Sequence, residues 1–231
     1  SFPTDALPIS IVADNHAPGG QQPQIANSAN GTPQVNIQTP SGAGVSRNVY
    51  SQFDVDGRGV VLNNSHANTS TQLAGMVAGN PNLAKGEARV ILNEVNTRDP
   101  SRLNGYIEVA GQKAQVVIAN PAGISCDGCG FINANRATLT TGQVQYGNGQ
   151  ISGYDVNRGE ILVQGGGLDA SSVDSTDLLA RAVKINAGVW AQELKVTAGR
   201  NQIDAAHSRT TAKSADGSAL PAVAIDVSAL G

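Results

Sequence analysis

The chain has 231 residues and a formal net charge of −3, and only 14% of its residues are charged, against roughly 25% in typical globular domains. It has no cluster of Lys or Arg, so the sequence predicts neither a nucleic-acid partner nor attraction to anionic lipid. No apolar run approaches the roughly 20 residues of a membrane-spanning helix, so no direct membrane insertion is expected. Aromatic residues make up 3%, which leaves Val, Ile, Leu and Ala to build a core, as in stacked buried strands.

Residues 1–34 contain five prolines among Gly and Asn, with one short strand predicted at residues 9–12. Proline cannot donate to a strand ladder and is confined to sheet edges. A stack of strands needs such a segment, because its open end would expose unpaired backbone groups. We therefore expect an N-terminal cap over residues 1–34.

From residue 35 onward, short apolar or alternating runs are separated by turn residues, which predicts an all-β chain. Strands are expected at 35–38, 49–55, 60–62, 89–95, 106–109 and 115–119. Residues 144–154 predict a hairpin, because Asn148-Gly149 suits the turn and both flanks alternate. We expect this hairpin to project from the main body.

The C-terminal third contains a loose repeat of short strands at 160–163 and 168–170, then at 182–185 and 189–191. Ile161 and Val183 are 22 residues apart, and Leu168 and Val189 are 21 apart. A β-helix has about three short strands in each turn, or rung, of roughly twenty residues, and the spacing of these strands fits that pattern. Residues 174–181 could form a short helix, but the rung spacing favours a strand. Further strands are expected at 193–196 and 222–227, and residues 165–167 are expected to form a corner between strands.

Catalytic motifs are absent, and no cofactor or metal site is expected. The three histidines stand in polar, turn-rich surroundings and are interpreted as solvated surface residues: His16, His66 and His207. Some parallel β-helices cleave polysaccharides with paired carboxylates. The candidate acids are scattered without a compelling pair, so catalysis is the least favoured function: Asp54, Asp56, Glu94, Asp99 and Glu108.

Cys126 and Cys129 are the only cysteines and form a single CxxC motif. A zinc site would need two further ligands, and the following residues look like a strand rather than the helix of a redox motif. A local structural disulfide is the favoured interpretation, and two free thiols are the alternative.

Two Asn-Pro motifs predict rigid corners at strand ends, because Pro fixes its own φ and pushes the preceding Asn toward extended geometry. Together with residues 45–65, the cysteine segment 124–133, and segments 136–142 and 179–184, they resemble the secretion domain of two-partner secretion exoproteins. That family includes filamentous haemagglutinin, haemolysins and contact-dependent growth-inhibition toxins, and the cysteines fit the branch of the toxins and haemolysins. The resemblance implies that the motif residues serve transporter recognition and secretion: Asn80, Pro81, Asn82 and Leu83, then Asn120, Pro121, Ala122, Gly123 and Ile124. Ala122 departs from the usual Asn.

The resemblance further implies a right-handed parallel β-helix with an N-terminal cap and extra-helical β elements. It implies one secretion domain over residues 1–231, with the β-helix from 35 to 231, truncated from a longer exoprotein. The expected partner is a TpsB-type outer-membrane β-barrel that recognises the domain through periplasmic POTRA domains. The expected location is the surface of a Gram-negative bacterium or its surroundings, and the expected state is monomeric and non-enzymatic. An adhesin or receptor-binding module is the alternative.

Overall fold

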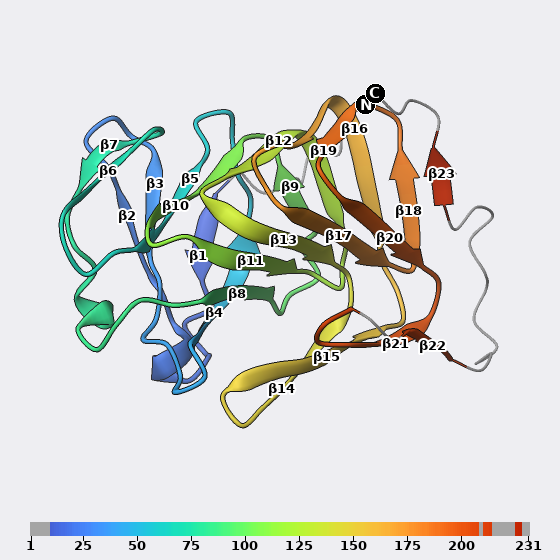
Figure 1. Ribbon diagram of the computed structural model, residues 1–231, viewed down its shortest axis with the longest axis horizontal. Helices are drawn as coiled ribbons and strands as arrows, with labels where there is room; N and C mark the ends of the chain where they lie inside the picture. Colours follow the sequence, from blue (N-terminus) through green and yellow to red (C-terminus); the bar gives the residue numbers. More distant parts are fainter. Residues whose placement is uncertain (1–9, 208–209, 214–224, 228–231) are drawn as a thin grey trace.

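The computed structural model describes residues 10–207, 210–213 and 225–227. Two long sheets face each other across a common apolar core. Figure 1 shows successive strands of each sheet stacked along the long axis of the molecule. Most pairings between sequential rungs are parallel, and the chain passes from one sheet to the other and back. The predicted all-β, parallel β-helical fold is confirmed.

The first sheet contains seven strands, and residues 143–156 and 201–204 of an extra-helical sheet pack on its outer face. In order across the sheet they are β1 (Ile11–Ala13), β4 (Val45–Phe53), β8 (Val90–Val95), β11 (Ala114–Ala119), β13 (Ala134–Thr140), β17 (Ser175–Ala180) and β20 (Leu194–Ala198). The strand β17 confirms that residues 175–180 are extended rather than helical.

The second sheet lies on the opposite side of the core. Its path is β2 (Gln24–Asn27), β3 (Pro33–Asn36), β5 (Val60–Asn64), β10 (Tyr106–Gly111), β12 (Ile124–Ile132), β16 (Glu160–Ala170), β18 (Ala182–Ile185) and β23 (Ile225–Val227). Two short strands join it at the side: β9 (Ser101–Leu103) on β12 and β19 (Val189–Ala191) on β16. Of the strand expected at 222–227, only residues 225–227 lie within the described residues.

The proposed repeat is confirmed by strand register. Ile161 pairs with Val183, and Leu168 pairs with Val189, as the 22- and 21-residue spacings require. All four side chains are buried in one continuous apolar core between the two sheets. The repeat arises because each rung must present its apolar residues to the same narrow interior.

An N-terminal cap closes one end of both sheets. The strand β1 pairs antiparallel with β4 and places Ile11 against the core, and β2 pairs antiparallel with β3. A 3₁₀ turn, η1 (Gly19–Gln21), connects the two capping strands. The cap is thus present within residues 10–34, while the first nine residues of the predicted range lie outside the described part.

Two antiparallel additions pack outside the β-helix. The hairpin of β14 (Gln143–Gly147) and β15 (Gln150–Val156) confirms the prediction and continues into β21 (Asn201–Asp204) and β22 (Thr210–Ala212). Figure 1 shows this extra-helical sheet extending below the stack. A second hairpin, β6 (Thr69–Thr71) and β7 (Gly75–Val77), packs on the second sheet through Val61 and Ala110.

Candidate functional site: two asparagine-proline corners

Asn80 holds the first corner from the interior of the protein. It is 1% exposed and precedes a single 3₁₀ turn, η2 (Pro81–Leu83). Its Oδ1 accepts a hydrogen bond from the Asn82 backbone N–H at 3.0 Å, which caps the turn. Its Nδ2 donates to the carbonyl oxygens of Ile37 and Asn63, both at 3.0 Å. One side chain therefore joins three separate segments of backbone.

The remaining residues of the first motif divide between core and surface. Pro81 occupies the first position of the turn, where its missing N–H costs no hydrogen bond, and it is exposed. The Asn82 side chain donates to the Ile37 carbonyl at 3.1 Å and to Gln24 Oε1 at 2.7 Å, which ties the corner to the N-terminal cap. Leu83 is 1% exposed and belongs to the main core.

Asn120 repeats this arrangement at the second corner. It is fully buried, and its Oδ1 accepts from the Ala122 N–H at 3.0 Å. Its Nδ2 donates to the Asp99 carbonyl at 2.8 Å and to Ser101 Oγ at 3.0 Å. The bond to Ala122 uses the backbone, so the alanine that replaces the usual asparagine keeps the turn.

Gly123 and Ile124 lead from the second corner into β12. Gly123 has a φ of +126°, a region that L side chains rarely adopt, and a Cβ there would lie 3.3 Å from the Glu160 carbonyl oxygen. Ile124 is buried in the main core. Pro121 and Ala122 are half-buried and are the residues of this corner that reach the surface.

The two cysteines form a disulfide inside the β-helix, with Cα atoms 5.3 Å apart and both residues buried. The register of β12 with β16 shifts between Asp127 and Cys129, where residues 165–167 of β16 lie opposite Gly128 alone. These three β16 residues are all glycines, and the Gly166 N–H donates to Asp127 Oδ1 at 2.8 Å. The prediction of a corner between strands at residues 165–167 was wrong, because these glycines lie inside the continuous strand β16 and form a bulge opposite the disulfide.

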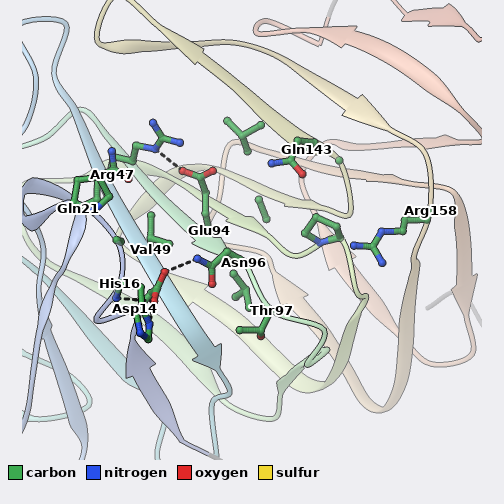
Figure 2. Close-up of a pocket in the computed structure, with 17 residues that line it drawn as sticks. Asp14, His16, Gln21, Arg47, Val49, Glu94, Asn96, Thr97, Gln143 and Arg158 are labelled. Atoms are coloured by element: carbon green, nitrogen blue, oxygen red, sulfur yellow. Dashed lines mark hydrogen bonds and ion pairs between the residues drawn. The ribbon is translucent and has the colours of Figure 1, made fainter.

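Figure 2 shows a cleft of the first sheet. It has a volume of about 510 Å³ and lies beside the second corner, since Pro121 is one of the residues that line it. Arg47 points toward Glu94, with an Nε–Oε1 distance of 2.7 Å, and its guanidinium lies 4.5 Å from the ring centre of Tyr146. On the other side, the Asn96 amide donates to Asp14. This cleft brings together the N-terminal cap, the first sheet and the extra-helical hairpin.

Four of the five carboxylates considered for catalysis are held by separate partners. Asp54 binds Arg102, Asp56 binds Arg58, and Glu94 binds Arg47. Glu108 is buried and accepts from the N–H groups of Gln72 and Leu73 at 2.9 and 2.8 Å, which anchors the β6–β7 hairpin. Within the described part of the chain, no three His, Cys, Asp or Glu side chains form a group that could hold a metal ion.

The interpretation of all three histidines as solvated was wrong for His207. His16 and His66 are exposed, but His207 is 1% exposed. Its Nδ1 lies 3.1 Å from Asp177 Oδ2 and 2.7 Å from an Arg136 nitrogen, and its ring packs edge-on against Tyr154. Burial alone would raise the pKa of Asp177. The hydrogen bond and charge of His207, together with Arg136, lower this pKa by more than burial raises it, so the net shift is downward. This cluster could not be predicted from local sequence patterns, because its members are up to 71 positions apart.

A capped parallel β-helix with an extra-helical sheet places the chain in a class of bacterial secretion domains. The chain belongs to the TPS secretion domain family, whose pattern it matches over residues 9–231. Its fold matches the crystal structure of the filamentous hemagglutinin secretion domain with a TM-score of 0.85 and 37% identity, over 95% of this chain and 75% of that one.

Toxin CdiA of Yersinia pestis is 70% identical over 222 residues, and tRNA nuclease CdiA-2 of Burkholderia pseudomallei is 49% identical over 227 residues. These alignments cover 96% and 97% of this chain but 7% of each relative, so the chain spans a small fraction of the proteins it matches. The family places the chain among exoproteins that are secreted from, or exposed on, Gram-negative bacteria. In the described residues, no helix has the length and apolar character needed to cross a membrane.

Proposed function

We propose that this chain is the secretion signal of a much longer exoprotein and directs it through a cognate TpsB-type outer-membrane β-barrel. In this proposal the periplasmic POTRA domains of the transporter bind the chain as a single monomeric domain over residues 1–231. The domain then nucleates β-helix folding outside the cell. Nuclease activity, which the names of several relatives state, belongs in this proposal to segments beyond the domain.

The difference between the two ends of the stack supports the nucleation step. The cap covers the N-terminal end with antiparallel strands, and Ile11 beneath it is buried. At the other end of the first sheet, β20 pairs parallel with β17, and its Leu194 and Val196 pack against the core while remaining half-buried. Another rung stacked on β20 would bury this apolar surface, so the domain can act as a template for further rungs.

The two Asn-Pro corners support a role in presenting the recognised surface. Asn80 and Asn120 use their polar atoms inside the protein, while Pro81 is exposed and Pro121 lines the wall of a cleft. We propose that the asparagines fix the shape of each corner and that the residues beside them contact the transporter.

Export of the chain in cells with and without the cognate transporter tests this proposal. Asn80→Ala and Pro81→Ala form a matched pair, because the first removes buried hydrogen bonds and the second alters only the exposed ring. We expect export to require the transporter and to fall for Pro81→Ala while its circular dichroism spectrum is unchanged. Export without the transporter would overturn the secretion role. Full export of a folded Pro81→Ala protein would remove the exposed ring from the recognised surface.

A further inference from the structure

Four residues of the second sheet form one outward-facing row across consecutive rungs. Tyr106 pairs with Gly130, Gly130 pairs with Asp169, and Asp169 pairs with Trp190. Their chain neighbours, such as Ile107 and Leu168, point into the core, so the row faces outward. Because adjacent strands lie about 4.8 Å apart, the row extends about 14 Å along the surface.

Glycines support both aromatic rings of the row. The Tyr106 ring lies over Gly130, where a Cβ would collide with it. The Trp190 ring lies against Gly188, where a Cβ would come within 2.6 Å of the indole Cη2. Trp190 is nevertheless 51% exposed. The sheet therefore positions a flat aromatic surface and leaves part of it open to solvent.

The carboxylate between the rings is held in a fixed orientation. Tyr106 Oη donates to Asp169 Oδ2 at 2.6 Å, and the N–H and Oγ of Ser171 donate to Oδ1 at 3.1 and 2.6 Å. The Ser171 and Tyr106 hydrogen bonds lower the pKa of Asp169, so it is an ionised acceptor at neutral pH. A carboxylate offers about four acceptor positions, and three are occupied, which leaves room for one further donor.

Two adjoining clefts meet at this row and share Tyr106, Asp169 and Ser171. The smaller, about 440 Å³, is floored by Gly128 and Gly166 and bounded by the two aromatic residues. The larger, about 880 Å³, is lined mainly by hydroxyl and amide side chains, including Thr69, Thr71, Gln72, Asn133 and Ser172. Its buried acid, Glu108, is already bonded to backbone amides, and Lys113 adds one exposed cation.

We propose that this row is a binding site for an oligosaccharide. One sugar ring stacks on Trp190, one of its hydroxyl groups donates to Asp169, and the following sugars lie in the hydroxyl- and amide-lined cleft. A ring's apolar face suits an aromatic surface, and its hydroxyl groups suit orienting polar groups of this kind. A basic peptide would fit this site less well than an oligosaccharide. A guanidinium binds a carboxylate through both oxygens, and Asp169 has only one free acceptor position. This site is separate from the corners and does not depend on the secretion role.

Trp190 is the only tryptophan in the chain, so its fluorescence reports directly on the proposed site. Hexasaccharides of N-acetylglucosamine, glucose and mannose are titrated into the full chain, with hexa-arginine as a competing class of ligand. Emission and iodide quenching are followed in the native protein, and calorimetry compares Trp190→Ala and Asp169→Asn. Met76→Ala is the matched control, since Met76 is 67% exposed and lines neither cleft.

We expect at least one hexasaccharide to shift the emission and shield Trp190 from iodide. Trp190→Ala should weaken binding about tenfold, in keeping with the loss of one aromatic contact, while Met76→Ala leaves it unchanged. Circular dichroism confirms that each variant is folded. The proposal is overturned if no hexasaccharide binds at concentrations up to about 10 mM, corresponding to very weak affinity. It is also overturned if a folded Trp190→Ala protein binds as well as the original, or if hexa-arginine alone binds.

Discussion

The side-chain amide of Asn80 donates a 3.0 Å hydrogen bond to the carbonyl oxygen of Ile37, a residue 43 positions earlier in the chain. Replacing Asn80 with alanine removes this bond, the bond to Asn63 and the cap of η2. A lost cap costs about 1 kcal/mol, and buried carbonyls left without donors cost about 1–3 kcal/mol more. We therefore expect Asn80→Ala to lower the free energy of unfolding by about 2–4 kcal/mol in denaturant titrations.

Pro81→Ala is the internal control for that measurement, because it leaves the three Asn80 bonds in place. Its effect should remain below about 1 kcal/mol, the scale of a proline's influence on the unfolded chain. Equal losses in the two variants would contradict the assignment of corner stability to the asparagine.

The decrease in the free energy of unfolding at acidic pH should depend on Asp177. Its pKa is lowered in the folded protein, so its stabilising effect is present above the unfolded value near 3.9 and is lost as pH falls below it. Asp177→Asn should destabilise the protein at neutral pH, by about 1–3 kcal/mol, and flatten the decline of stability as the pH falls below about 4. Urea unfolding at closely spaced pH values checks this, with Asp174→Asn as the comparison on the exposed turn before β17. An unchanged pH profile would exclude a contribution from the Asp177 cluster.

The disulfide should add modest stability because it closes a very short loop. Cys126 and Cys129 are three positions apart, and chain-entropy arguments give about 2 kcal/mol for such a loop. Reduction should lower the free energy of unfolding by about this amount. Thiol titration should detect no free thiol without reductant, even in denaturant. Two reactive thiols in the denatured, unreduced protein would instead support the free-cysteine alternative.

Glu108→Gln should loosen the β6–β7 hairpin while leaving the β-helix folded. Glu108 accepts from the N–H groups of Gln72 and Leu73, and glutamine offers one acceptor oxygen where the carboxylate offers two. Hydrogen exchange should therefore accelerate at the amides of residues 72 and 73, by about tenfold for each 1.4 kcal/mol of lost stability. Unchanged exchange there, with faster exchange in β10, would show that Glu108 supports the sheet instead.

The parts of the fold that could be predicted are those in which a local pattern determines the structure. The apolar side chains of Ile161 and Val183 must enter the same interior, so their spacing revealed their register. The Asn148-Gly149 turn likewise identified the extra-helical hairpin, and both residues have positive φ. Asn80 and Asn120 were recognised from proline chemistry and resemblance, but their burial could not be read from the sequence.

The features that were missed depend on contacts between distant segments. The strand β13 has buried threonines, Thr138 and Thr140, in place of the apolar residues that mark a strand. His207 is buried because the extra-helical sheet folds back on Arg136 and Asp177. Tyr106 and Trp190 are far apart in the sequence, and only the stacking of successive strands places them in one row.

The side-chain hydrogen bonds of Asn80 and Asn120 reach mainly to earlier residues of the chain, and this affects the order in which the domain can fold. Asn80 bonds to Ile37 and Asn63 behind it and to Asn82 just ahead, and Asn120 bonds to Asp99, Ser101 and Ala122. None of these hydrogen bonds requires a residue more than two positions later in the chain. A chain released from its N-terminus can therefore lock each corner as soon as two further residues are free. In the export that we propose, folding can therefore keep pace with delivery, and each completed corner opposes the return of the segment already delivered.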